Sequence, residues 1–354
     1  MTTPTEPDND DTPTVEIPAT PAEPGVIYQA DVTQPTVMAS DDTALWPSTC
    51  HRCQGVIDGD GYCTQCGARA QSLRNHYELA GGDWVGGVCD IGLLHRRNED
   101  ALAIQASPVA DERAVLVVCD GVTTSQDADV ASLAGARAAC LSLWQASPQG
   151  LAGIDQSRTA ALAQALRQAV QAANEAVVAA TDPDSPNPAS ATFAAALIQE
   201  GQAYWANLGD SRVYWFPDAG EPVLLSCDHS LAQAQIAEGV TRQAAEASAL
   251  AHTITKWLGR DAVDLEPAVG QWPLAADGWL MVCSDGLWNY ASEPTALAAV
   301  LAAVTPETGT APLQVAQGLV DWANRQGGHD NITVALARCT GPDPEATTEP
   351  SSAA

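Results

Sequence analysis

The sequence predicts an α+β fold, a layered sandwich of antiparallel strands and helix pairs that is preceded by a small zinc ribbon. Three observations predict it. Short apolar runs separated by glycine and proline turns fill the middle of the chain, as in an antiparallel meander. Two pairs of helical segments, one alanine-rich and one late in the chain, flank those runs. Two C-x2-C pairs stand before all of these elements.

The first 44 residues are rich in threonine, proline and acids and have no apolar periodicity, so we expect residues 1–44 to be disordered. Thr33 and Thr36 lie among the acids and prolines of this tail. Phosphorylated, they would offer a docking site for a phosphothreonine-binding module. A plain solvated tail is the simpler interpretation of the same composition, and it is favoured. Residues 341–354 are expected to form a second disordered tail.

Residues 45–72 carry the cysteine pairs Cys50/Cys53 and Cys63/Cys66. Two such knuckles place four thiolates tetrahedrally around one zinc ion, and the glycines and aspartates between them favour turns. A disulfide framework is the alternative, but a reducing compartment disfavours it. Because four thiolates fill every position, the zinc would be structural, and a ribbon of this size needs it to fold.

Residues 73–83 are expected to be a linker, and the large domain to span residues 84–340. Apolar alternation and continuous apolar runs predict strands at 84–94, 101–105, 114–119, 191–198, 202–208, 212–216, 222–225, 253–258, 264–272, 279–283 and 332–338. Helical spacing predicts helices at 130–145, 155–180, 231–248, 293–304 and 311–325. In the longest of them, Leu162, Leu166 and Val170 recur at steps of four and mark one apolar face.

The composition excludes several classes of function. A formal net charge of −29 with a single lysine, Lys256, argues against a nucleic-acid partner, which needs a basic patch. The first residues lack the basic and apolar regions of a secretory signal, and no apolar run has the length of a membrane span. We therefore expect a cytoplasmic protein with no membrane partner.

Acidic residues stand at the ends of predicted strands. Asp120 ends the apolar run VLVVCDG, and Asp285 ends the run WLMVCSDG. Asp330 precedes the last strand, and Glu99 and Asp100 precede the strand at 101–105. A carboxylate at a strand end is held by the sheet and points into a loop, which is the arrangement a metal site needs. These positions predict one carboxylate cluster that binds hard divalent cations.

Six short motifs follow one another along the chain: NED (98–100), DG (120–121), GDSR (209–212), DHS (228–230), SDGLW (284–288) and GHDN (328–331). In these motifs and in their order the chain resembles the metal-dependent PPM (protein phosphatase 2C-like) serine/threonine phosphatases of bacteria. The resemblance covers residues 84–338. It implies an αββα sandwich in which two antiparallel sheets are flanked by helix pairs.

The resemblance also implies hydrolysis of phosphoserine and phosphothreonine in proteins, opposing a serine/threonine kinase, at a centre of two Mg²⁺ or Mn²⁺ ions with an activated water. Three acids, Asp120, Asp285 and Asp330, would be catalytic. Asp120 would bridge both ions, the Gly121 carbonyl would bind one of them, and Asp285 and Asp330 would complete the other.

Three further acids would assist this centre. The resemblance implies that Glu99 and Asp100 act mainly through metal-bound waters. It also implies that Asp210, together with Asp285, holds a third and weaker ion. Magnesium keeps several waters when bound, so few direct protein ligands suffice.

The sequence departs from the family pattern at two places. His95 stands where the family usually has an arginine that grips the substrate phosphate, and residues 122–125 (VTTS) replace a glycine-rich loop. His95, Arg96 and Arg97 are therefore the candidate phosphate contacts. The departures leave an alternative open, a catalytically weak pseudophosphatase that binds phosphoproteins or acts as a scaffold. The complete set of acids favours the enzyme.

Overall fold

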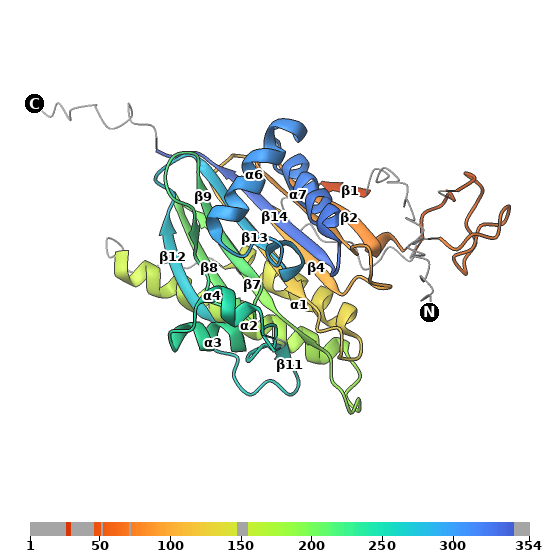
Figure 1. Cartoon of the computed structure of the whole chain (residues 1–354), viewed down its shortest axis with the longest axis horizontal. Coiled ribbons are helices and arrows are strands. Elements are labelled where there is room, and N and C mark those ends of the chain that lie inside the picture. The colour runs from red at the N-terminus through yellow and green to blue at the C-terminus, as the bar shows by residue number, and fades with distance from the viewer. Residues whose placement is uncertain are drawn as a thin grey trace, which may run out of the picture.

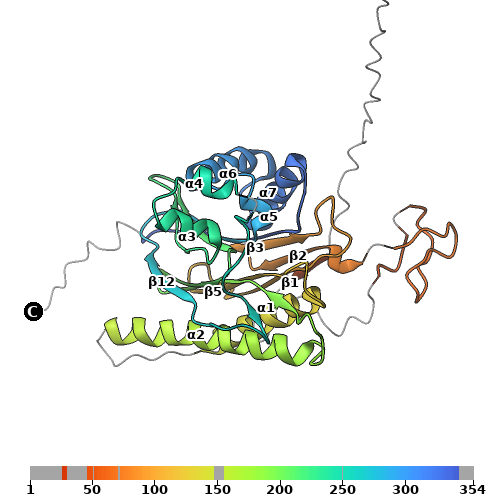
Figure 2. The same cartoon turned by 60° about the horizontal axis from the view of Figure 1, so that its bottom comes forward.

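The computed structural model describes residues 26–29, 46–50, 52–70, 72–146, 155–248 and 250–342. Two sheets pack face to face and helices cover both outer faces, which gives the αββα layers seen in Figures 1 and 2. This confirms the predicted α+β sandwich. No helix among these residues is long and apolar enough to cross a membrane.

The larger sheet has seven strands. In spatial order they are β1 (Val26–Gln29), β2 (His76–Gly81), β3 (Val85–Asp90), β14 (Ile332–Cys339), β13 (Gly278–Cys283), β9 (Arg212–Pro217) and β10 (Val223–Leu224). All neighbours are antiparallel except β1, which runs parallel to β2.

The smaller sheet has five antiparallel strands. They are β12 (Ala268–Pro273), β8 (Gln202–Leu208), β7 (Phe193–Gln199), β5 (Arg113–Asp120) and β4 (Asp100–Ala106). A separate two-stranded ladder joins β6 (Ser190–Ala191) to β11 (Leu258–Gly259).

Helices α1 (Ala128–Gln145) and α2 (Asp155–Ala180) cover the five-stranded sheet, and α6 (Pro294–Thr308) and α7 (Pro312–Gln326) cover the seven-stranded one (Figure 2). The short helix α5 (Asp285–Trp288) follows β13, and the 3-10 helix η1 (Leu73–Asn75) precedes β2. Two more short helices, α3 (Leu231–Ala237) and α4 (Arg242–Glu246), lie between β10 and β11. We call residues 229–248 and 250–255 the α3–α4 segment.

The core explains why β5 is a continuous apolar run. Val115 and Val117 pack toward α1 and α2, whereas Leu116 and Val118 pack between the sheets. Successive side chains of a strand point to opposite faces, so a strand that is covered on both faces must be apolar at every position. The same holds for β13. Burial on both faces makes the ends of these two strands rigid supports for the acids that follow.

The predicted linker at residues 73–83 is wrong, because this stretch forms η1 and β2. Tyr77 and Leu79 point inward and are fully buried, while the polar residues that alternate with them, His76 and Glu78, are partly exposed. The large domain thus begins at about the end of the cysteine-rich segment. Residues 26–29, inside the tail expected to be disordered, form β1 at the sheet edge. Their sequence, VIYQ, is rich in the β-branched and aromatic residues that favour strands.

Two predicted elements between residues 231 and 258 are shorter than expected. The predicted helix at 231–248 is interrupted, because Gly239 adopts a φ of 96° and separates α3 from α4. The predicted strand at 253–258 is reduced to a bridge between Ser230 and Ile254 and to the first residue of β11.

Candidate metal centre

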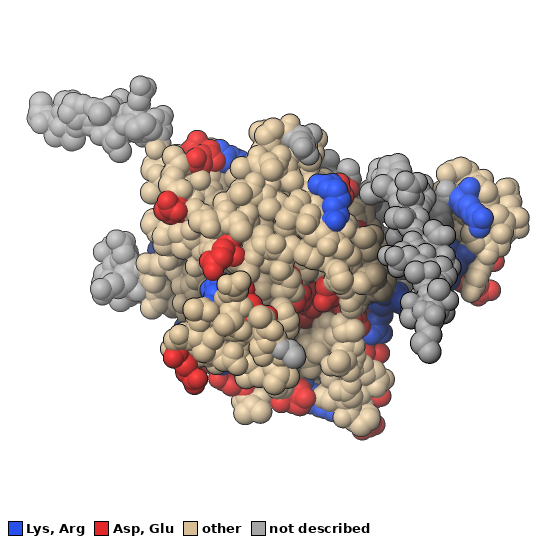
Figure 3. Space-filling model, viewed as in Figure 1, with Lys and Arg blue, Asp and Glu red and all other residues tan. Residues whose placement is uncertain are grey.

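The acids predicted from the strand ends gather where the two sheets meet. Asp100 begins β4 and faces Asp120, the last residue of β5, directly across the ladder. The negative charges of Asp100, Asp285, Asp330 and Asp210 all act on Asp120. Acidic side chains are visible in the hollow near the middle of the face in Figure 3.

The second sheet supplies Asp285 and Asp330. Asp285 begins α5 immediately beyond β13, and Asp330 precedes β14, which pairs with β13. The glycines after the acids allow this close approach. A Cβ on Gly286 would lie 2.0 Å from the Asn331 carbonyl oxygen, and one on Gly121 would lie 2.6 Å from the Glu99 carbonyl oxygen. Packing therefore requires a glycine after each of these two acids.

Asp100 is held by two hydroxyl groups. Ser284 Oγ and Thr333 Oγ1 donate hydrogen bonds of 2.7 and 2.6 Å to Asp100 Oδ2. Burial raises the pKa of Asp100 to about 7, even though these two hydrogen bonds favour the charged form. The repulsion from Asp330 and Asp285 acts in the same direction as burial.

The neighbouring acids are shifted in the same direction. Burial, followed by the charges of nearby acids, raises the pKa values of Asp120 and Asp210 well above the usual range. Burial and the charge of Asp330 raise the pKa of Asp285 to about 6. Packing carboxylates together away from water disfavours their ionised forms unless a cation compensates.

Several carboxylate oxygens lack a partner. Among the described residues, Glu99 Oε2, Asp100 Oδ1 and Asp285 Oδ1 are buried and accept no hydrogen bond. A buried polar atom without a partner is costly, so such atoms point to a missing ligand. The atoms here are all carboxylate oxygens, which are the donors that Mg²⁺ and Mn²⁺ prefer. The residues present therefore fit a centre for these ions.

Asn331 ties the loop before Glu99 to β14. Its side-chain oxygen accepts a 2.8 Å hydrogen bond from the Glu99 backbone N–H. Its side-chain nitrogen donates to the carbonyl oxygens of Ile91, at 2.8 Å, and Arg97, at 3.3 Å. The NED and GHDN motifs are thus joined directly, and Asn331 orients the loop.

The three candidate phosphate contacts have different surroundings. His95 Nε2 lies 3.3 Å from Asp330 Oδ1. Arg97 is bound to acids, with Nη2 2.5 Å from Glu99 Oε1 and Nη1 3.4 Å from Asp129 Oδ1. Arg96 is exposed and forms no hydrogen bond or ion pair with the described residues.

Sequence reasoning missed the hydroxyl groups of Ser284 and Thr333, and it missed His252. Ser284 had a local signal, since it stands immediately before Asp285. Thr333 is a polar residue that β14 buries completely, and such a residue calls for a partner. His252 had no local signal, because no acid or motif adjoins it in sequence.

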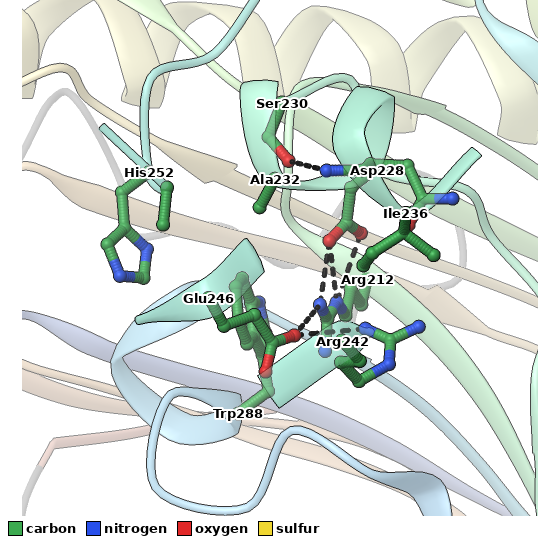
Figure 4. Close-up of a pocket in the computed structure, with 11 residues that line it drawn as sticks. Arg212, Asp228, Ser230, Ala232, Ile236, Arg242, Glu246, His252 and Trp288 are labelled. Carbon is green, nitrogen blue, oxygen red and sulfur yellow. Dashed lines mark hydrogen bonds and ion pairs between the residues drawn. The ribbon is translucent and has the colours of Figure 1, made fainter. Parts of the chain in front are cut away.

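A buried arginine lies behind the centre. Arg212 is 1% exposed; its Nη2 lies 2.7 Å from Asp228 Oδ2, and its guanidinium stacks 3.5 Å from the Trp288 ring centroid. Trp288 Nε1 in turn donates a 3.0 Å hydrogen bond to the Asp210 carbonyl oxygen. Figure 4 shows Arg212 between Asp228 and Glu246, where it links β9 to the α3–α4 segment. The GDSR and DHS motifs are thus joined by a buried ion pair.

The four cysteines of the N-terminal segment also converge. Their sulfur atoms all lie within 4.8 Å of one another, with Cys50 and Cys66 3.7 Å apart and Cys53 and Cys63 3.4 Å apart. The structure records all four as free thiols. A backbone hydrogen bond from Cys66 is the main factor that lowers the pKa of Cys63 to about 6. This geometry fits one tetrahedral metal ion.

Comparison with known proteins gives a consistent result. The family described as "Protein phosphatase 2C" matches residues 95–323. The serine/threonine phosphatase stp of Listeria monocytogenes is 28% identical over 252 residues, which cover 70% of this chain and 92% of that protein. The protein phosphatase PhpP of Streptococcus pneumoniae is 34% identical over 157 residues. That match covers 44% of this chain and 60% of PhpP, so it spans less than two thirds of the relative.

Solved structures show the same fold. The serine/threonine phosphatase PstP/Ppp of Mycobacterium tuberculosis is 26% identical, with a TM-score of 0.56, and the match covers 72% of this chain and 98% of that one. The catalytic domain of PstP in complex with two manganese ions is 25% identical, with a TM-score of 0.54 and coverage of 72% and 97%.

Proposed function

Because this chain belongs to the protein phosphatase 2C family, we propose that it hydrolyses phosphoserine and phosphothreonine in proteins with the help of two Mg²⁺ or Mn²⁺ ions. The observation that carries the proposal is the set of buried carboxylate oxygens that have no partner where the sheets meet. The related phosphatases, one of which is a manganese complex, support the same assignment.

The proposed ligands come from both sheets. Asp120, the last residue of β5, and the Gly121 carbonyl lie at the end of the five-stranded sheet, while Asp285 and Asp330 lie at the end of the seven-stranded one. Glu99 and Asp100 would complete the centre through bound waters, and Asp210 would hold a third ion with Asp285. When bound, such ions supply an activated water and neutralise the charge of the phosphate.

The residues around these ligands keep them in place. Ser284 and Thr333 fix the Asp100 carboxylate, and Asn331 holds the Glu99 loop, so little reorganisation is needed when the ions bind. Among the candidate phosphate contacts, Arg96 is the best placed, since its charge is not already paired with an acid. Arg97 would instead orient Glu99.

The test is hydrolysis of a phosphothreonine peptide by the purified full chain, with and without millimolar Mn²⁺. We expect Mn²⁺-dependent turnover that Asp120→Asn abolishes while its circular dichroism spectrum stays unchanged. Turnover that survives in Asp120→Asn would refute the metal assignment. A folded, metal-loaded chain without turnover would instead support the pseudophosphatase alternative. The relatives named above are phosphatases and do not favour that alternative.

For the N-terminal segment we propose one structural Zn²⁺ bound by Cys50, Cys53, Cys63 and Cys66. The mutual sulfur distances support this proposal.

We also propose that the substrates are phosphoproteins produced by a serine/threonine kinase and that the protein acts in the cytoplasm. Thr33 and Thr36, the suggested docking site for a phosphothreonine-binding module, lie outside the described residues.

A further inference from the structure

A histidine that no motif indicated lies beside two acids of the centre. Asp210, His252 and Asp285 each offer a ligand atom, and these three atoms lie within 4.8 Å of one another. Donors that share a transition-metal ion at about 2 Å are about 3–4 Å apart, so a small adjustment would bring all three onto one ion. The three residues come from the β8–β9 turn, the α3–α4 segment and α5.

The two acids are prepared for a ligand. Asp285 Oδ1 is buried and accepts no hydrogen bond from the described residues, while Asn289 Nδ2 orients Oδ2 by donating a 3.0 Å hydrogen bond. Asp210 is 4% exposed, and its backbone is fixed by Trp288. The hydrogen bond to Oδ2 thus fixes the Asp285 carboxylate, and Oδ1 stays available for a ligand.

The imidazole of His252 is also available. It is exposed, it lies 6.1 Å from the Trp288 ring, and its nitrogens form no hydrogen bond with the described residues. In Figure 4 it lies apart from the ion pairs of Arg212 and Glu246. A ring nitrogen without a hydrogen-bond partner that faces two carboxylates is a suitable metal donor.

The α3–α4 segment holds His252 at this position. The Leu231 backbone N–H donates a 3.0 Å hydrogen bond to the Thr253 carbonyl oxygen, so the chain after Ala251 runs back along the start of α3. Glu246 of α4 accepts hydrogen bonds from Arg242, at 3.0 Å, and from the Ser292 hydroxyl, at 2.5 Å. The segment is thereby attached to the body next to α5.

We propose that Asp210, Asp285 and His252 form a mixed nitrogen–oxygen site for a first-row transition-metal cation, with His252 as a ligand that makes the site prefer Mn²⁺ to Mg²⁺. Imidazole is a borderline donor that suits transition metals, whereas Mg²⁺ prefers oxygen donors in a strict octahedron. The proposal rests on the proposed function, in which Asp210 and Asp285 alone would hold the third ion. A bound ion would also tie the α3–α4 segment to the end of β13.

The experiment measures metal binding on the full chain. Mn²⁺ is the probe, because the four-cysteine cluster selects softer ions. Pulsed electron paramagnetic resonance of bound Mn²⁺ should show coupling to an imidazole nitrogen that is lost in His252→Ala. We expect the same variant to weaken the weakest Mn²⁺ site about tenfold and Mg²⁺ binding at that site less than about twofold.

Two matched variants make the result decisive. His329→Ala removes another exposed histidine near the centre and should retain the nitrogen signal. His95→Ala removes the histidine beside Asp330 and should retain it as well. The proposal is overturned if the signal persists in His252→Ala, or if Mn²⁺ and Mg²⁺ lose affinity equally. Neither measurement depends on turnover, so loss of the proposed phosphatase activity and loss of this site are distinguished.

Discussion

His95 Nε2 lies 3.3 Å from Asp330 Oδ1, and this places an imidazole against one of the proposed metal ligands. In the family pattern the same position holds an arginine for the substrate phosphate. An arginine is always charged and can bind a phosphate through two parallel hydrogen bonds, whereas an imidazole can do neither consistently. At the proposed phosphate position this chain therefore has a histidine, which lacks the permanent charge and the paired donors of an arginine.

His95→Arg should strengthen substrate binding. A permanent charge with two donors at this position should add about 1–2 kcal/mol to phosphate binding, which is about a 5- to 30-fold fall in KM. Steady-state kinetics on a phosphothreonine peptide would measure this, with Arg96→Ala as the comparison. If Arg96→Ala raises KM strongly and His95→Arg changes nothing, Arg96 already supplies the phosphate contact.

Thr333→Val should weaken metal binding with little effect on the fold. The substitution keeps the shape of the side chain but removes one of the two hydroxyl groups that donate to Asp100 Oδ2. Loss of such a supporting hydrogen bond typically costs about 10- to 100-fold in metal affinity. A calorimetric Mn²⁺ titration would measure it. Thr333→Ser keeps the hydroxyl and should bind Mn²⁺ nearly as the parent does. Equal affinities for all three proteins would exclude a role for this hydroxyl.

The acids of the centre could be predicted from sequence because their signals are local. Asp120 and Asp285 each end an apolar run that is covered on both faces, so strand, strand end and acid are all visible within a few residues. His252 could not be predicted, since contacts made by distant residues such as Ser292 hold its segment in place. The β2 strand was missed although Tyr77 and Leu79 alternate, because the intervening polar residues and a nearby glycine pair favour a linker.

Arg212→Met should destabilise the fold strongly. The substitution leaves Asp228 buried without its partner, and breaking a buried ion pair in this way costs about 3–5 kcal/mol. It also removes the stacking on Trp288. Urea unfolding would give the change in free energy. The double variant Arg212→Met/Asp228→Leu leaves no unpaired charge, so it should recover part of the loss. A double variant as unstable as the single one would point to stacking and packing as the main contribution of Arg212.

Cys63→Ser should remove the bound zinc and leave the large domain folded. The four cysteine sulfurs are mutually close, and none of the described hydrogen bonds links one of them to the sandwich. Elemental analysis should give about one zinc per chain for the parent and almost none for the variant. Thermal unfolding of the large domain, followed by tryptophan fluorescence, should be unchanged. Cys227→Ser removes an exposed cysteine outside the cluster and should retain the zinc. A zinc content that is equal in all three proteins would rule out the four-cysteine site.

The pH dependence of stability should reveal His76, which joins β2 to β3. His76 Nδ1 lies 2.6 Å from Asp90 Oδ2, and Nε2 lies 3.7 Å from Glu78 Oε1. Burial opposes the charged imidazole, but the hydrogen bonds and charges of Asp90 and Glu78 outweigh it and raise the pKa to about 9. The charged form is thus stabilised by folding. Its contribution, about 3 kcal/mol, should be complete below pH 6.5 and disappear as the pH rises through 9.

The comparison of parent and His76→Gln isolates this contribution from other titrating groups. Urea unfolding at pH 6 should show the variant to be less stable by about that amount, and at pH 10 the two proteins should differ much less. The uncharged glutamine keeps a polar side chain of similar length, so loss of packing contributes little to the difference. A gap between the two proteins that does not change with pH would mean that His76 acts by packing alone. A gap that widens toward pH 10 would mean that His76 is neutral in the folded protein.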